Sequence, residues 1–164
     1  MLFYAGITSG RIFRLVITTL QTKGKVNMQI TSKCLCGSVE LEVELSGTEV
    51  AACHCDMCRK WSGGPLLAID SGELKNISGE SFVKRYQSSE WAERGFCSEC
   101  GTHLFYYLKP ANQYHFPIGL LDSGSRYKLT HQIFIDEKPD YYDFSNETKN
   151  MTGAELFAHF GAEQ

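Results

Sequence analysis

The chain has 164 residues, of which 43% are hydrophobic and 21% are charged, and its formal net charge is −3. This length suits one domain with its own core, and no stretch approaches the roughly 20 apolar residues of a membrane-spanning helix. Residues 1–27 carry four basic residues and no acidic one, so the remainder carries −7. Because phosphate binding needs clustered Lys and Arg, this acidic body argues against nucleic acid as the main partner.

Residues 1–27 differ in composition from the rest of the chain. One interpretation is an upstream start, with Met28 opening the domain, and the other is a basic mitochondrial presequence. We favour the first. We therefore expect residues 1–27 to be an extension outside the fold, residues 28–145 to form the domain, and residues 146–164 to be a C-terminal tail or short helix.

From Met28 onward the sequence predicts short β-strands. Residues 38–45 alternate strictly between polar and apolar side chains, which is typical of a half-buried strand. Ser-Gly pairs at 46–47, 71–72 and 78–79 have the chemistry of turns. The further strands expected are residues 65–69, 74–77, 82–86, 92–96, 103–108, 114–118 and 132–135.

Helical signals are sparse. Residues 55–61 predict one or two turns, and residues 152–160 predict a terminal helix with Thr152 as N-cap and Glu155 as its capping-box partner. Closely spaced short strands with Gly-rich turns indicate an all-β domain with few short helices. We see no repeats and no second domain.

The seven cysteines all lie between Cys34 and Cys100. Disulfide scaffolds have an even number of cysteines and a secretory signal, whereas here the apolar run at residues 15–17 is too short for one. We therefore expect reduced thiols that bind metal, in a reducing compartment such as the cytoplasm.

Two of the three cysteine clusters are pairs followed by glycine. Cys97-Ser98-Glu99-Cys100-Gly101 has the form of a zinc knuckle, in which the turn points both sulfurs at one ion. A structural zinc takes four ligands. Cys34 and Cys36, also followed by a glycine, supply the second pair, so a four-thiolate structural zinc is predicted.

The middle cluster leaves three cysteines, Cys53, Cys55 and Cys58. Three protein ligands with an open fourth position are the pattern of a catalytic zinc. Three thiolates make the ion a weak Lewis acid, better suited to activating an incoming thiol than to making hydroxide. Two alternatives stay open: a second structural site completed by His54 or Asp56, and reduced cysteines without metal. A redox dithiol at Cys97 and Cys100 lacks a βαβ context.

The three motifs together resemble the family of glutathione-dependent formaldehyde-activating enzymes, which shares a domain with centromere protein V. The resemblance runs from about residue 28 to about residue 143. All seven cysteines have a counterpart in the family. The segment from His131 to Pro139, an apolar run followed by Lys-Pro, resembles the family's late strand.

The resemblance implies a tent-like, Mss4-like zinc-binding β fold. It implies a structural zinc held by Cys34, Cys36, Cys97 and Cys100, and a catalytic zinc held by Cys53, Cys55 and Cys58. It also implies the activity of a carbon–sulfur lyase that joins formaldehyde to the thiol of glutathione. We expect two zinc ions per chain, a small-molecule thiol as substrate, glutathione as co-substrate, and no nucleic-acid or membrane partner.

Several further residues are candidates for the site. Arg59 and Lys60 follow the open site and could hold the carboxylates of glutathione, or could be a solvated surface pair. We expect Arg94 at the surface, and Trp61 and Trp91 in the core or the site wall. For the remaining aromatic candidates we expect packing roles, with His131 the one to test for a site role: His103, His115, His131, Tyr141 and Tyr142.

Two other functions compete with the enzyme. A non-enzymatic zinc-stabilised interaction module would need a basic or Pro-rich extension, for which only residues 1–27 offer support. A methionine sulfoxide reductase would need a nucleophilic cysteine late in the chain. We reject the reductase, because no cysteine follows Cys100.

Overall fold

The computed structural model describes residues 27–121 and 126–160. The predicted extension, residues 1–27, lies outside the described residues except for its last position. The strands are β1 (Met28–Lys33), β2 (Glu40–Leu45), β3 (Glu49–Cys53), β4 (Leu66–Ser78), β5 (Val83–Ser89), β6 (Ala92–Cys97), β7 (His103–Leu108), β8 (Gln113–Pro117), β9 (Lys128–Ile133) and β10 (Lys149–Met151). The helices are α1 (Asp56–Ser62) and α2 (Gly153–Phe160), with short 3-10 turns η1 (Glu80–Phe82) and η3 (Ile135–Glu137).

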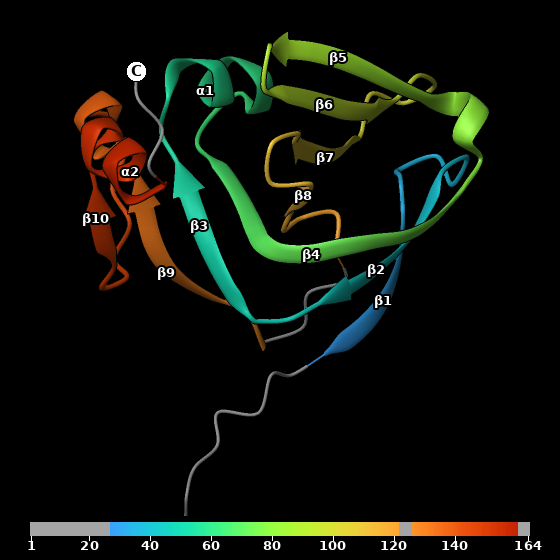
Figure 1. The fold of residues 1–164 in the computed structure, drawn as a ribbon, viewed down its shortest axis with the longest axis horizontal. Coiled ribbons are helices and arrows are strands. Elements are labelled where there is room, and N and C mark those ends of the chain that lie inside the picture. Colours follow the sequence, from blue (N-terminus) through green and yellow to red (C-terminus); the bar gives the residue numbers. More distant parts are fainter. Residues whose placement is uncertain (1–26, 122–125, 161–164) are drawn as a thin grey trace, which may run out of the picture.

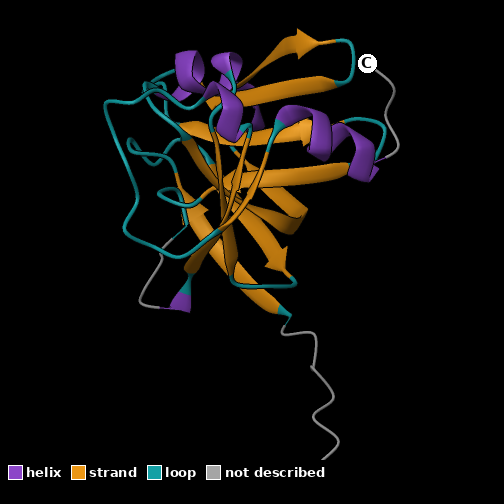
Figure 2. Cartoon of the chain, turned by 90° about the vertical axis from the view of Figure 1, so that its left-hand side faces the viewer, coloured by secondary structure: helices purple, strands orange, loops and turns teal. Residues whose placement is uncertain are grey.

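The strands of the described residues form one strongly curved, mixed sheet. Its main path runs β10-β9-β3-β4-β8-β7-β6-β5, and the β1–β2 hairpin joins it through β2 and β4. The parallel pairs within residues 27–121 and 126–160 are β9 with β3 and β9 with β10. Helix α1 lies at the end of β3, near the β5–β6 hairpin, and α2 lies beside β10 (Figure 1). Figure 2 shows both helices toward the same end of the molecule. The expected all-β class with few short helices is confirmed.

The long strand β4 corrects one prediction. Residues 65–69 and 74–77 were expected as two strands separated by a turn at residues 71–72, but β4 runs unbroken for 13 residues. Its first half pairs with β3 and its second half with β2. Gly72 serves packing rather than a turn, because a Cβ there would lie 2.6 Å from the ring of the fully buried Phe116.

The prediction succeeded where the local pattern is strong. Strand β7 has the predicted bounds, and β2 alternates between buried and less buried residues as its sequence predicts. Helix α2 begins with the predicted capping box, since Glu155 N donates to Thr152 Oγ1 at 3.2 Å and Thr152 N donates to Glu155 Oε2 at 2.8 Å. Strands β1, β3 and β10 were missed, since none of the predicted strands covers residues 28–33, 49–53 or 149–151. Strand β10 extends the sheet beyond residue 145.

The core lies inside the curve of the sheet. Its fully buried large side chains come from β2, β4, β7 and β8: Leu41, Leu45, Ile69, Leu104, Phe105 and Phe116. Cys34 and Cys97 also belong to this core, so the first and third cysteine clusters pack against it. No helix of the described residues is long and apolar enough to cross a membrane.

Gly95→Ala is expected to lower the free energy of unfolding by about 1–3 kcal/mol, the usual cost of overpacking a core. Gly95 lies on the buried part of β6, where a Cβ would meet Phe105 ring atoms at 2.3–2.6 Å. The matched control is Gly64→Ala, because a Cβ at Gly64 meets nothing within 4 Å. Urea unfolding of both variants checks this, and equal destabilisation would contradict it.

Candidate metal centres

The first group of cysteines brings together two segments that are far apart in sequence. The sulfurs of Cys34, Cys36, Cys97 and Cys100 all lie within 4.8 Å of one another. Cys34 and Cys36 sulfurs are 3.5 Å apart, and Cys36 and Cys97 sulfurs are 3.8 Å apart. Four ligands at about 2.3 Å from a tetrahedral zinc ion would be about 3.8 Å from each other. The four residues therefore fit such an ion.

Two backbone turns of different length, each with a glycine, present these sulfurs. Gly37 N donates to Cys34 O, and Gly101 N donates to Cys97 O, each at 2.9 Å. Both glycines have a positive φ, 79° and 72°, which is the left-handed conformation that glycine adopts without strain. Thr102 Oγ1 links the two turns, since it accepts a hydrogen bond from Leu35 N and lies 3.1 Å from Cys100 Sγ.

The second group lies where β3 passes into α1. Cys53 ends β3, Cys55 precedes the helix, and Cys58 lies within the helix. Their three sulfurs lie within 4.8 Å of one another, and no other His, Cys, Asp or Glu donor of the described residues joins them. Cys58 is buried, whereas Cys53 and Cys55 are half-buried. Three soft donors in this arrangement can hold a metal ion with one position left open.

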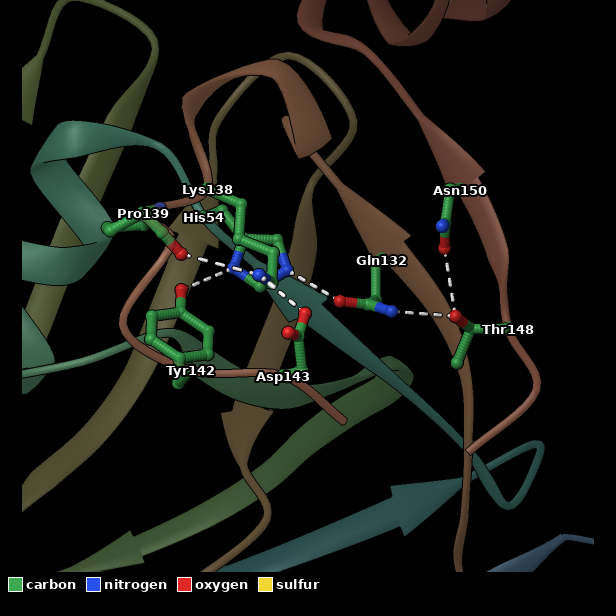
Figure 3. Close-up of polar contacts among 8 residues, drawn as sticks. All are labelled: His54, Gln132, Lys138, Pro139, Tyr142, Asp143, Thr148 and Asn150. Atoms are coloured by element: carbon green, nitrogen blue, oxygen red, sulfur yellow. Dashed lines mark hydrogen bonds and ion pairs between the residues drawn. The ribbon is translucent and has the colours of Figure 1, made fainter. Parts of the chain in front are cut away.

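His54 does not complete this group. Its fully buried ring lies 3.0 Å from Gln132 Oε1 through Nε2 and 2.6 Å from Tyr142 Oη through Nδ1 (Figure 3). Gln132 Nε2 donates to Thr148 Oγ1 at 2.7 Å, so the amide oxygen must face the histidine. His54 Nε2–H therefore donates to Gln132, and Nδ1 accepts from Tyr142. Burial lowers the pKa of His54, which favours the neutral ring.

Asp56 does not complete the group either. Its carboxylate is more than half exposed and forms an ion pair with Lys60 at 2.8 Å. Its backbone N–H donates to Glu137 Oε2 at 2.8 Å, so Glu137 caps the first turn of α1. The neighbouring Asp136 accepts from Gly153 N at the start of α2. One short segment thus anchors the N-termini of both helices, which the sequence pattern did not reveal.

The two basic residues after the middle cluster have different surroundings. Lys60 is 76% exposed and forms its ion pair with Asp56 along the helix. Arg59 is more buried, and its Nε donates to the backbone oxygen of His54 at 2.7 Å. Arg59 therefore holds the segment that carries Cys53 and Cys55. Neither residue belongs to the group of three sulfurs.

Arg94 was expected at the surface, and this prediction is wrong. Its side chain is 2% exposed, and Nη2 donates to Cys58 Sγ at 3.5 Å. The guanidinium lies over the rings of Tyr106 and Trp61, with its carbon 5.1 Å and 5.7 Å from their centroids. Hydrogen bonds from Cys53 and Cys55, together with Arg94, lower the pKa of Cys58 to about 3.

Aromatic side chains from α1, β6 and β7 pack near Arg94. Trp61 packs on His103 with ring centroids 4.6 Å apart, and edge-on against Phe96 at 5.6 Å. Burial raises the pKa of Tyr106 to about 12. Three of the other candidates lie elsewhere: Trp91 and Tyr141 are 48% and 76% exposed, contrary to the packing expected of them, and His131 contacts Thr130.

A polar groove of about 490 Å³ lies on the other side of the His54 network. Gln132, Thr148 and Asn150 line it, together with Lys138 and Asp143, which form an ion pair at 2.8 Å (Figure 3). None of the seven cysteines lines this groove. The groove is therefore separate from the three-cysteine group.

Comparison with known proteins agrees with these motifs. The sequence profile described as "Glutathione-dependent formaldehyde-activating enzyme" matches residues 29–137. An uncharacterized lyase of Schizosaccharomyces pombe is 35% identical over 75% of this chain and 90% of its own length. A Podospora anserina protein named for the same activity as the profile is 35% identical over 46% of this chain, a match that spans 38% of that protein.

One solved structure is also similar. A crystal structure of a Rhodobacter sphaeroides protein matches with a TM-score of 0.48 and 24% identity, covering 57% of this chain and 88% of that one. The profile match spans most of the described domain and includes both cysteine groups. The chain belongs to the family of glutathione-dependent formaldehyde-activating enzymes.

Proposed function

We propose that the protein is a zinc-dependent carbon–sulfur lyase that acts on the adduct of a thiol and a small aldehyde, with glutathione and formaldehyde as its pair. The observation that carries the proposal is the group of three sulfurs without a fourth protein donor among the described residues. In the direction of synthesis the thiolate sulfur attacks the carbonyl carbon, a C–S bond forms, and the carbonyl oxygen takes up a proton. In the reverse direction the C–S bond breaks and the aldehyde leaves.

Zinc held by Cys53, Cys55 and Cys58 would supply one thing, a lowered pKa for a thiol that binds in the open position. The chain's own residues do the rest. His54 and Arg59 hold the backbone between Cys53 and Cys55 from two sides. Arg94 places a positive charge against Cys58. The second zinc, at Cys34, Cys36, Cys97 and Cys100, would be structural, because protein ligands fill every position.

The role of Arg59 and Lys60 in binding the carboxylates of glutathione stays part of this proposal. Lys60 is accessible for it, whereas Arg59 would have to bind through its terminal nitrogens while Nε holds His54 O. A cytoplasmic location suits both the reduced cysteines and glutathione as substrate. The absence of nucleic-acid and membrane partners stays a prediction.

Purified protein is expected to contain two zinc ions per chain, and glutathione is expected to change the release of one of them to a chelator. The measurement is metal content by mass spectrometry, followed by chelator competition with and without glutathione. The thiol should change the release of one ion and leave the other unaffected. An interaction module would instead hold one ion, or two ions that are indifferent to thiol, and either result would contradict the enzyme.

A further inference from the structure

Arg94 is a buried positive charge that contacts the three-cysteine group through Cys58. Among the side chains that the structure describes, no carboxylate forms an ion pair with it, and its Nη1 has no hydrogen-bond partner. Burying a guanidinium without a counter-charge destabilises the folded state. Among the described side chains that contact it, Cys58 offers a sulfur that carries a negative charge when it binds a metal ion.

The position of Arg94 depends on three separate parts of the fold. Strand β6 carries it, β7 supplies Tyr106 on one side, and α1 supplies both Trp61 and Cys58. The guanidinium contacts both aromatic rings, and the side chain is 2% exposed. In such surroundings a charge acts more strongly on its neighbours than it would in water.

From this arrangement we infer that the positive charge of Arg94 allows the three-cysteine centre to bind an anionic fourth ligand. Three thiolates around a divalent ion leave one net negative charge, which Arg94 balances. An incoming thiolate then meets a neutral centre. Without Arg94 it would meet a negative one, and its binding would be opposed. Arg94 thus acts through Cys58 as a positioning residue, and it makes the centre prefer an anionic ligand to a neutral one. This inference rests on the proposed function.

The expected size follows from the distances. A charge about 5 Å from the centre, at an effective dielectric constant of about 20, changes the affinity for a thiolate by up to about 300-fold. A neutral ligand in the same position is affected much less. The ratio of the two affinities therefore separates an electrostatic role from a purely structural one.

The experiment uses the full chain with cobalt(II) in place of zinc, so that ligand binding is read from the visible absorption spectrum. The probes are 2-mercaptoethanol, which binds as an anion and carries no other charge, and imidazole, which is neutral. The variants are Arg94→Met, which removes the charge at similar length, and Arg94→Lys, which keeps it. Thermal unfolding confirms that each variant is folded.

For Arg94→Met we expect the affinity for 2-mercaptoethanol to fall about 10- to 100-fold and that for imidazole to stay within about threefold. Arg94→Lys should keep the ratio of the two affinities within about threefold of the wild-type value. If Arg94→Met does not fold, this ratio is tested with Arg94→Lys. Equal losses for both probes, no loss, or a changed ratio in Arg94→Lys would overturn the inference. If the wild-type protein binds neither probe, the open site itself is refuted.

Discussion

Cys97→Ser is expected to lower the midpoint of thermal unfolding by about 10 °C or more, whereas Cys55→Ser should lower it by only a few degrees and abolish activity. The two cysteine groups differ because one connects segments far apart in the sequence and the other connects neighbouring residues. Cys97 is fully buried at the end of β6, and its sulfur lies 3.8 Å from that of Cys36, a residue 61 positions away. A metal there closes a long loop and ties the β1–β2 hairpin to the β6–β7 hairpin. Closing a long loop restrains the unfolded chain more than closing a short one.

Cys55 belongs to a group that spans only residues 53–58, so a metal there closes a short loop. Its side chain is also half-buried rather than fully buried. Two further variants test the assignment: Cys100→Ser should behave like Cys97→Ser, and Cys53→Ser like Cys55→Ser. Differential scanning calorimetry and metal content provide the measurements. Similar loss of stability in all four variants would refute the division into a structural and a catalytic group.

The grouping of the sulfurs could be predicted because the cysteines come in closely spaced sets, and a set within a few residues stays together in any fold. Two sets followed by glycine had the same turn chemistry, which suggested that they share an ion. Gly37 and Gly101 share a positive φ, although the Gly37 turn spans one residue fewer than the Gly101 turn. Strands with strict alternation, such as β2, were predictable for a related reason, because their signal is also local.

The surroundings of the three-cysteine group could not be predicted in the same way. Arg94 lies in a short strand beside glycine, and nothing near it in sequence indicates burial. Its environment comes from Trp61 and Tyr106, which reach it from other elements. Strand β4 misled the prediction because a Ser-Gly pair usually makes a turn, whereas Gly72 here makes room for Phe116. Such contacts depend on the tertiary structure, which local propensity does not describe.

His54 is the clearest case of a residue whose role depends on distant partners. It stands between two cysteines, and the sequence left it open as an alternative fourth ligand. Its ring instead bonds to Gln132 and Tyr142, 78 and 88 residues away, and stacks on Tyr142 at 5.6 Å. Its backbone N–H donates to Ile133 O, and its backbone oxygen accepts from Arg59. The residue therefore fixes the direction in which Cys53 and Cys55 point.

His54→Ala is expected to lower the free energy of unfolding by about 2–4 kcal/mol, because it leaves a cavity and an unpaired buried oxygen on Gln132. It should also speed the release of one zinc ion to a chelator and leave the four-cysteine ion unaffected. Tyr142→Phe is the matched control. It removes one hydrogen bond from the same ring, so about 1 kcal/mol is expected, with a smaller change in release.

A second variant separates positioning from ligation. Gln132→Leu leaves His54 in place but removes the acceptor of its Nε2–H. If His54 acts by holding the segment, Gln132→Leu should also speed release of the same ion, and the cobalt spectrum of both variants should keep its sulfur-to-metal bands. If His54 were a ligand, Gln132→Leu would free its ring nitrogen for the metal and slow the release. That outcome would return His54 to the coordination sphere and close the open position on which the lyase proposal depends.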